Sequence, residues 1–576
     1  MRLSRRLSSA WLQKPQVNPP PSPKAITPPY NAKQYPDSPS WPTFSQWTAF
    51  NATLKGNLIK AVPAASPCYP GPSQSRTNCL AAAKLRAPDD PIQVRTAWFS
   101  GFPCPAEYDN GTGHCSLGNY SPYVVKAMSK EDVSEGVKFA NEHGLRLVVK
   151  NTGHDFLGRN LGYGSLSIWT HNLRGIDFKE SWTPSVGPPL GKKQSAVVFG
   201  SGIQWRELYG AAYKANKTIV GGADPDVGAG GGWALGGGHG PMANRYGLGV
   251  DNILEMEVVL PSGAIIITNS NSYPDLFWAM RGGGGSTFGI VTKMTFATHA
   301  PELQHGIRIT ITPGDSNSAG YTKGMAYLMT KMPEFVDFGM TGYPIMSATK
   351  YESLFTTPGK EASDIDDFIS PIVDRLEKMG LTVSLIRIPS WSNVLANSLG
   401  LSPNGATGLK TGTNVMGTRL LTRGSFADVK NWERVLAIFF AEGYITEPFA
   451  LMGGKVAQNK GLDVSLNPAW RNAIMHFSIL DKDSDKYGSV AGIEKAYRRM
   501  QDLHVPLLDA MSADNAAYFN EASYIEPKWQ HTFWGSNYPR LVGVKQKYDP
   551  NNTFWCHPCV GNEGLVLGND RKLYRR

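Results

Sequence analysis

Three glycine-bearing segments constrain the fold of this chain more than any other feature of its sequence: residues 150–158, 221–240 and 281–289. Glycine lets backbone N–H groups turn inward, and a phosphate oxygen can then approach without meeting a Cβ. One such loop alone is an ordinary turn, whereas three together predict a dinucleotide cofactor. None of them matches G-x-G-x-x-G or G-x-x-x-x-G-K-S/T, which argues against a Rossmann NAD enzyme and against a P-loop.

The first glycine segment follows a predicted strand–helix–strand unit. Residues 123–125 form the first expected strand, and Ser129, three residues before Asp132, is a capping-box-like start for the helix. Gly144 is expected to end that helix, and residues 145–149 form the second strand. Further expected elements are strands at about 166–169 and 197–200, a helix at 204–215, a hairpin of 253–260 and 264–268, a helix at 275–281 and a strand at 288–296.

The pattern of the chain changes after about residue 301. Strands such as 307–312 alternate there with amphipathic helices near 361–379, 426–442 and 491–503, which predicts a second α+β domain. Residues 515–560 are dense in Trp, Tyr, Phe and Asn and indicate a return of the chain to the first domain.

These segments resemble the FAD-binding domain of the vanillyl-alcohol-oxidase superfamily, the PCMH-type fold, and in particular its fungal berberine-bridge-enzyme-like branch. The resemblance is carried by VKNTGHDFLG at 149–158, GGADPDVG at 221–228, YGLGVDN at 246–252, DLFWAMRGGGG at 275–285, NYPRL at 537–541 and KYDP at 547–550. It covers residues 118–300 and 515–560 well and the region between them loosely.

The resemblance implies an α+β, two-domain PCMH-type FAD-binding fold, with an α+β substrate domain built on an antiparallel sheet flanked by helices. The expected divisions are a disordered Pro-rich lead at 1–44, an N-terminal segment with local disulfides at 45–117, the FAD-binding domain at 118–300, the substrate domain at 301–514, and a return with a basic tail at 515–576.

The implied cofactor is FAD, bound covalently through His154 to the methyl carbon of the flavin ring. The remaining cofactor-binding residues expected from the resemblance are Lys150, Asn151, Thr152, Gly153, Asp155, Gly158, Gly222, Asp224, Val227, Gly228, Gly232, Gly236, Gly237, Gly238, Asn252, Gly289, Val291 and Asn537.

The chain departs from the family at Asp224. Many members carry a second covalent link from a Cys just before the Pro-x-Val-Gly element, and here that position is Asp224. Since the chain has no Cys between Cys115 and Cys556, we expect a single tether. The residue after the Val-Gly pair is thought to gate oxygen in the family, and here it is the small Ala229. We therefore expect an oxidase that passes electrons to O2.

The candidate catalytic residues lie in the C-terminal return. Tyr518 aligns with an element that often supplies a substrate-contacting Tyr in the family, and Glu521 is a second candidate base. A phenol needs a lowered pKa to act as a base, so Tyr518 is equally well interpreted as a core aromatic. His239, in Gly-Gly-Gly-His-Gly, is interpreted as a structural or pocket residue.

The net charge of +10 does not indicate a nucleic-acid partner. Residues 1–40 hold six Lys/Arg against one acid and residues 569–576 hold four against one, so these tails supply most of the charge. No basic stripe interleaved with aromatics occurs. No apolar run is long enough for a membrane span. We expect a monomer acting on a small organic molecule, without nucleic-acid or membrane partners.

Six cysteines and five N-x-S/T sequons favour an oxidising compartment and the secretory pathway. The short spacings suggest the pairs Cys68–Cys79 and Cys104–Cys115. The pair Cys556 and Cys559 is compatible with a third bridge, a redox pair or two free thiols, and no second CxxC completes a zinc site, so no metal site is expected. The basic N-terminus lacks the apolar stretch of a signal peptide, and ten prolines follow it between Pro15 and Pro42.

Two functions of different classes remain open at this point. The first is an FAD oxidase or dehydrogenase acting on an alcohol, a reducing sugar or a secondary-metabolite intermediate. The second is a secreted binding protein that keeps the fold but has lost turnover, against which the intact His154 loop argues.

Overall fold

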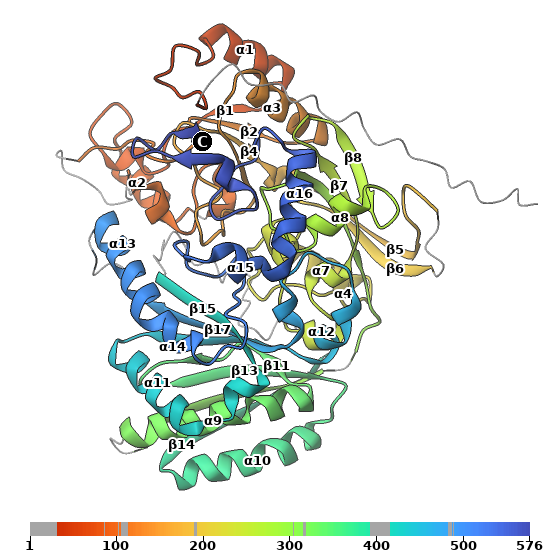
Figure 1. The fold of residues 1–576 in the computed structure, drawn as a ribbon, viewed down its shortest axis with the longest axis vertical. Helices are drawn as coiled ribbons and strands as arrows, with labels where there is room; N and C mark the ends of the chain where they lie inside the picture. The colour runs from red at the N-terminus through yellow and green to blue at the C-terminus, as the bar shows by residue number, and fades with distance from the viewer. Residues whose placement is uncertain are drawn as a thin grey trace, which may run out of the picture.

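A computed structural model describes residues 32–85, 87–101, 103–104, 113–188, 193–302, 304–314, 318–391, 415–481, 487 and 489–576 (Figure 1). Two smaller sheets are formed by the N-terminal half of the chain, and one large sheet is formed by residues 304–481. This division confirms the predicted α+β, two-domain architecture.

The first small sheet has the strand order β1 (Leu58–Lys60), β2 (Tyr123–Lys126), β4 (Leu166–Trp169), β3 (Leu147–Lys150). β2, β4 and β3 run parallel. Helix α3 (Lys130–Glu142) connects β2 to β3 and begins at Ser129, whose hydroxyl accepts from Asp132 N–H in a capping box. Gly144 follows the helix at φ 62°. The predicted strand–helix–strand unit is confirmed, and β3 begins two residues later than predicted.

The second small sheet is antiparallel, with the order β5 (Ile176–Trp182), β6 (Gln194–Gly200), β9 (Ile290–Ala297), β7 (Ile253–Val259), β8 (Ile265–Asn269). β7 and β8 form the predicted hairpin. The helices associated with this sheet are α4 (Trp205–Lys214), α5 (Gly232–Gly236), α6 (Ala243–Tyr246), α7 (Gly249–Asn252) and α8 (Pro274–Met280). Both longer helices, α4 and α8, lie where the apolar pattern predicted them.

The large sheet has eight antiparallel strands. They are β10 (Gln304–Pro313), β11 (Thr341–Gly342), β12 (Ile345–Met346), β13 (Tyr351–Pro358), β14 (Leu381–Trp391), β15 (Val415–Thr422), β16 (Ile445–Leu451) and β17 (Ala473–Asp481). Its helices are α9 (Ser318–Phe338), α10 (Ala362–Lys378), α11 (Val429–Ala441), α13 (Val490–Arg499) and α14 (Val505–Asp509). Figure 1 shows α9, α10 and α11 on the side of this sheet that faces away from the smaller sheets.

The two faces of the large sheet have different surroundings, as β17 shows. Met475, Phe477 and Ile479 belong to the apolar core shared with the helices. Since successive side chains in a strand point to opposite faces, His476 and Leu480 point toward the smaller sheets. Every residue of β17 is buried, so this second face is covered as well.

The C-terminal segment packs on the smaller sheets. It contains α15 (Trp529–Trp534) and α16 (Tyr538–Tyr548). The buried Lys545 of α16 donates from Nζ to the backbone oxygens of Thr287 and Phe554, each at 2.7 Å, and pairs with Asp549. A buried ammonium needs such partners, so this lysine fixes the helix to the third glycine segment.

The ordered chain begins earlier than the predicted lead of 1–44 allows. Tyr35 is completely buried, and its hydroxyl accepts a hydrogen bond from Leu573 N–H at 2.7 Å. Lys33 N–H donates to the carbonyl of Leu573 at 3.1 Å. These partners are at the far end of the chain, so local proline content could not reveal them. The predicted disorder of residues 1–31 lies outside the described residues.

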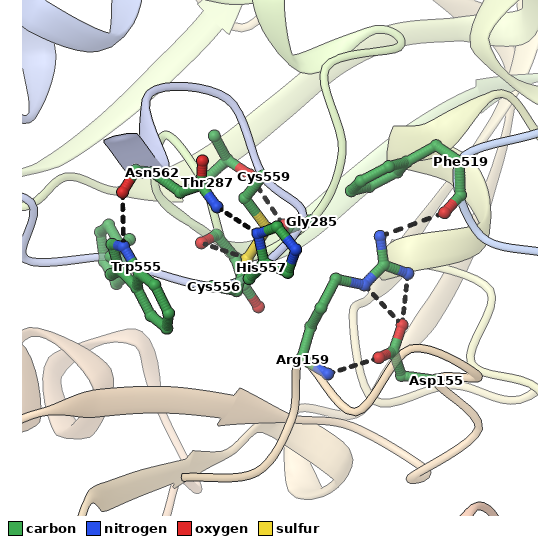
Figure 2. The surroundings of a disulfide bond; sticks show 12 residues. Asp155, Arg159, Gly285, Thr287, Phe519, Trp555, Cys556, His557, Cys559 and Asn562 are labelled. Carbon is green, nitrogen blue, oxygen red and sulfur yellow. Dashed lines mark hydrogen bonds and ion pairs between the residues drawn. A yellow bond between two sulfur atoms is a disulfide. The ribbon is translucent and has the colours of Figure 1, made fainter. Parts of the chain in front are cut away.

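The structure contains all six cysteines as disulfides: Cys68–Cys79, Cys104–Cys115 and Cys556–Cys559. Both suggested local pairs are confirmed, and of the three alternatives for the third pair the structure has the bridge. Figure 2 shows this third bridge beside the third glycine segment, where Cys556 Sγ lies 3.7 Å from the carbonyl oxygen of Ser286. Within the described ranges, no helix combines the length and apolar composition needed to cross a bilayer.

Candidate active site

A cavity of about 580 Å³ lies between the loops of the smaller sheets and the face of the large sheet that points toward them. Its wall combines the loop after β3, segments 222–235 and 285–291, and residues 518–521 of the C-terminal return. The side of the cavity formed by the large sheet is lined by Tyr343, Met416, Glu447 and Leu480. Segments far apart in the sequence, from Arg95 to Glu521, therefore line one chamber.

The loop that leaves β3 carries Asn151, Thr152, Gly153, His154 and Asp155 into the cavity wall. Gly153 has φ 83°, and a Cβ there would lie 2.8 Å from the carbonyl oxygen of Gln93. Only glycine fits both conditions. The loop is held open at its base because Asn151 Nδ2 donates to the carbonyl of Ser201 at 2.7 Å.

His154 is enclosed by two charged residues. Arg95 Nη1 lies 3.1 Å from His154 Nδ1 and pairs with Asp224 Oδ2 at 2.5 Å. Burial lowers the pKa of His154 to about 4, with Arg95 and Lys150 adding to the shift and Asp224 opposing it. The imidazole is therefore neutral at physiological pH, which is the nucleophilic form.

Asp224 stays ionised in this arrangement. Burial raises the pKa of its carboxyl, but the adjacent His154 and Arg95 outweigh that effect and hold the pKa below its ordinary value. Asp224 is thus an ion-paired carboxylate on the cavity wall.

Asp155 and Arg159 join the same loop to the C-terminal return (Figure 2). Arg159 donates to Asp155 through its backbone N–H at 2.6 Å and through Nε at 2.8 Å. Its guanidinium also donates to Asn520 Oδ1 at 2.9 Å and lies 4.0 Å above the ring of Phe519. The loop at 151–155 is thereby fixed relative to residues 518–521.

The chamber has polar groups that the protein does not satisfy. Asn151 Oδ1, Asn160 Oδ1 and Ser201 Oγ are buried and have no hydrogen-bond partner among the described residues, and all three residues line the wall. Gly232, also on the wall, has no atom within 4 Å of the position of an added Cβ. Buried polar atoms are normally paired, so this wall is suited to a polar, elongated ligand such as a dinucleotide.

Most predicted cofactor residues are on the wall of this cavity. They are Asn151, Thr152, Gly153, His154, Asp155, Gly222, Asp224, Val227, Gly228, Gly232, Gly289 and Val291. The others pack behind it: Lys150, Gly158, Gly236, Gly237, Gly238, Asn252 and Asn537.

Those residues behind the wall have protein partners. Lys150 Nζ donates to the carbonyls of Ala87 and Asp90 at 2.9 and 2.7 Å. A Cβ on Gly158 would lie 2.4 Å from the Phe99 ring, and one on Gly236 would lie 2.4 Å from Asn520. These residues support the loops rather than face the cavity.

Two further members of this set donate to backbone carbonyls. Asn252 Nδ2 donates to the carbonyl of Leu248 at 2.8 Å, and Asn537 Nδ2 donates to that of Leu466 at 2.7 Å. Gly237 is close to Leu466 and Gly238 is close to Trp233. Their side chains and backbone fix α7 and the second glycine segment in place.

Glu521 lies between two histidines. Its Oε2 is 3.1 Å from His239 Nε2 and 3.4 Å from His476 Nδ1. Tyr343 Oη is 3.4 Å from the other ring nitrogen of His239, Nδ1. Burial raises the pKa of Glu521, but the charge and hydrogen bond of His239, with His476, outweigh it and keep the carboxyl below its ordinary pKa.

Tyr518 is less suited to act as a base. Burial, followed by the charge of Glu521, raises the pKa of its phenol well above the ordinary value. Its hydroxyl accepts a hydrogen bond from Asn520 Nδ2 at 2.9 Å. The structure brings both predicted catalytic residues to the cavity, and the ionised one is Glu521.

Sequence reasoning missed four of the residues that shape this site: Arg95, Arg159, Tyr343 and His476. None lies in a glycine segment, and His476 sits in an otherwise apolar strand. The one sequence feature that could have indicated His476 is its position as a polar residue within that strand. His239, interpreted as a pocket or structural residue, is on the cavity wall.

Two family descriptions match the chain. Residues 121–269 match "FAD binding domain" and residues 517–561 match "Berberine and berberine like". The FAD-linked oxidoreductase apf9 of Gibberella fujikuroi is 32% identical over 567 residues, covering 93% of this chain and 95% of the relative. The VAO-type flavoprotein oxidase VAO615 of Thermothelomyces thermophilus is 31% identical and covers 92% of each chain.

Solved structures agree with this. The crystal structure of the VAO-type flavoprotein MtVAO615 from Myceliophthora thermophila C1 superimposes with a TM-score of 0.84 at 29% identity, covering 95% of this chain and 100% of that one. Glucooligosaccharide oxidase from Acremonium strictum, described with 6-S-cysteinyl, 8α-N1-histidyl FAD, has a TM-score of 0.62 at 20% identity and covers 77% of this chain and 92% of its own. The latter shares the fold.

Proposed function

Because this chain belongs to the VAO-type, berberine-bridge-like family of FAD-dependent oxidoreductases, we propose that it holds FAD through one covalent bond to His154 and oxidises a small organic substrate. The observation that carries the proposal is the neutral, buried imidazole of His154 on the wall of a chamber with unsatisfied polar atoms. The residues that line the chamber fit a dinucleotide cofactor.

The single tether follows from the residue types present. Glucooligosaccharide oxidase is described with both a histidyl and a cysteinyl bond to its flavin. Here Asp224 occupies the position where the resemblance places the Cys, and the described cysteines are all in disulfides. His154 would hold the flavin ring, with Arg95 and Asp224 beside the imidazole, and no second side chain would bond to it.

Bound FAD supplies a two-electron acceptor for the substrate's hydride. The residues of the chain do the rest. Met416, Leu480 and Tyr343 provide a largely apolar surface for the substrate on the large sheet. Both histidine contacts of Glu521 fall on Oε2, so Oε1 accepts the proton of the substrate hydroxyl. An alcohol then becomes a carbonyl compound as its hydride and proton leave.

The electron acceptor is O2 in this proposal. The choice of O2 is supported by the relative described as a flavoprotein oxidase. The oxygen gate predicted at Ala229 does not support it. Ala229 is completely buried in the apolar core around Ile203, so its methyl group packs in the protein interior. One turnover converts an alcohol and O2 into a carbonyl compound and H2O2.

Secretion and a monomeric state remain predictions. The three disulfides support an oxidising compartment. Size-exclusion chromatography with light scattering tests the monomer, and enzymatic deglycosylation of material secreted by a fungal host tests the sequons.

Acid precipitation of the purified holoenzyme tests the tether. We expect a yellow pellet from the wild type and a colourless one from His154→Ala. The matched control is His171→Ala, which alters another histidine whose pKa burial lowers to about 4 but which is not on the cavity wall. A colourless wild-type pellet would disprove the covalent bond.

Photometry of the flavin during a substrate screen tests turnover. Bleaching without air, followed by recovery and peroxide on readmission of air, is expected of an oxidase. Reduced enzyme that persists in air would instead identify a dehydrogenase. No bleaching with any alcohol or sugar of the screen would favour a binding protein.

A further inference from the structure

His239, His476 and Glu521 converge from three separate parts of the fold. His239 follows α5, His476 is in β17, and Glu521 is in the C-terminal return. One side-chain donor atom of each lies within 4.8 Å of the other two. We propose that these three residues bind one first-row divalent transition-metal ion at the substrate end of the cavity. The site itself does not depend on the proposed function, and only its catalytic consequence does.

The spacing of the donor atoms fits a metal site. At metal–nitrogen and metal–oxygen bonds of about 2.1 Å, neighbouring ligands of a tetrahedral ion are about 3.4 Å apart. Glu521 Oε2 is 3.1 Å from His239 Nε2 and 3.4 Å from His476 Nδ1, so two of the three ligand separations match. The separation of the two histidine nitrogens is at most 4.8 Å.

The chemical composition of the cluster is that of known metal sites. Two imidazoles and one carboxylate bind zinc in hydrolytic enzymes and iron(II) in non-haem oxygenases. His476 is completely buried and His239 is 5% exposed, so neither is a surface histidine that binds metal adventitiously. A carboxylate oxygen between two imidazole nitrogens, all three buried or nearly so, gives an enclosed set of ligand atoms suited to a cation.

The far side of the His239 ring is also positioned by the protein. Tyr343 Oη lies 3.4 Å from Nδ1, the nitrogen that points away from Glu521. The Trp470 ring stacks at 22° to the imidazole plane with the centroids 6.4 Å apart. Metal-bound histidines generally have such a partner on the second nitrogen, because it fixes the tautomer and the ring orientation.

The site keeps an open coordination position. His239 and Glu521 line the cavity, so a fourth ligand would reach the ion from the chamber where the substrate is proposed to bind. A hydroxyl oxygen bound there would lose its proton more easily, since a divalent cation lowers the pKa of a bound hydroxyl. Glu521 Oε1 would receive that proton while Oε2 remains a ligand.

Elemental analysis of the holoenzyme tests the site directly. The protein is produced without a polyhistidine tag and purified without chelating resin, and its metal and flavin contents are compared. We expect one metal ion per polypeptide. After removal with dipicolinate, Zn²⁺ should rebind at one site in calorimetry, and Co²⁺ should give absorption bands at wavelengths beyond those of the flavin.

Substitutions locate the ion. His476→Gln and Glu521→Gln should each lose the metal at unchanged flavin content. His504→Gln is the matched control, because His504 is a buried histidine bonded to Tyr444 through Nδ1 at 3.1 Å, outside the cluster. It should keep the metal.

Wild-type protein that contains no first-row metal and takes up neither Zn²⁺ nor Co²⁺ would overturn the proposal and leave a hydrogen-bonded cluster. Metal retained by both cluster variants would also overturn it, since the ion would then lie elsewhere. Because metal content is measured without substrate, either result is independent of whether the flavin turns over.

Discussion

Covalent flavin attachment at His154 should continue in mild acid, where an ordinary histidine would be protonated. With a pKa of about 4, roughly 97% of the imidazole is neutral at about pH 5.5. At the ordinary value of 6.5 only about 9% would be neutral at that pH. Since the neutral ring is the nucleophile, the attachment rate at this pH should stay near its plateau, instead of falling about tenfold.

Arg95→Met provides the structural perturbation for this prediction. It removes one of the cations that lower the pKa of His154 and leaves Asp224, whose charge raises it. The acid limb of the attachment rate should therefore move part of the way toward pH 6.5, with a loss at about pH 5.5 well below tenfold, because burial, the largest cause of the shift, remains. The rate at neutral pH should change little. The control is Arg174→Met, which alters an arginine paired with Glu207 outside the cavity wall.

The assay mixes FAD with apoprotein from a riboflavin-starved host, stops samples in acid, and measures in-gel flavin fluorescence against time. A wild-type rate that falls tenfold between about pH 7.5 and pH 5.5 would refute the neutral, buried imidazole. Identical pH profiles for wild type and Arg95→Met would refute the role assigned to Arg95.

Three further predictions concern catalysis and stability. Glu521→Gln should lower kcat by about 10²- to 10⁴-fold because the proton acceptor is lost, whereas Tyr518→Phe should change kcat by only a few-fold. Stopped-flow flavin reduction measures both rates. A larger loss in Tyr518→Phe than in Glu521→Gln would contradict the assignment. Replacing both Cys68 and Cys79 by Ser should lower the free energy of unfolding by about 3 kcal/mol, since the bridge closes a loop of sequence separation 11; an unchanged Tm would contradict this. The free energy of unfolding should fall as pH drops from 6.5 to about 4, because the buried His171 and His299 bind a proton in the unfolded chain at a higher pH than in the folded one. A melting temperature that does not change over that pH range would contradict this prediction.

The predictions that succeeded rest on local patterns. The capping box at Ser129 and Asp132 and the hairpin of β7 and β8 are set by residues a few positions apart, so they could be recognised without a structure. The antiparallel large sheet, by contrast, was expected from the family resemblance and not from a local pattern.

The features of the site that could not be predicted from the sequence involve residues far apart in the chain. His239 and Glu521 are 282 residues apart, and Arg95 and Asp224 are 129 apart, so no local motif could pair them. The reason why a given glycine is required is equally hard to predict from the sequence. Gly228 is needed because a Cβ would lie 2.2 Å from Asn151, and the reason is packing between two loops. Sequence indicates that a glycine matters, but the neighbour that requires it is a tertiary contact.

The position of the C-terminal return has a consequence for biosynthesis. Residues 518–521 complete the chamber, Asn520 donates to Gly232 at 2.8 Å, and Cys556 lies against Ser286. While these last residues are still within the ribosome, the chamber lacks one side and the third bridge does not exist. The chamber can therefore close only after residues 518–521 have emerged and packed against the second glycine segment, and a nascent chain stalled before residue 518 should bind no flavin.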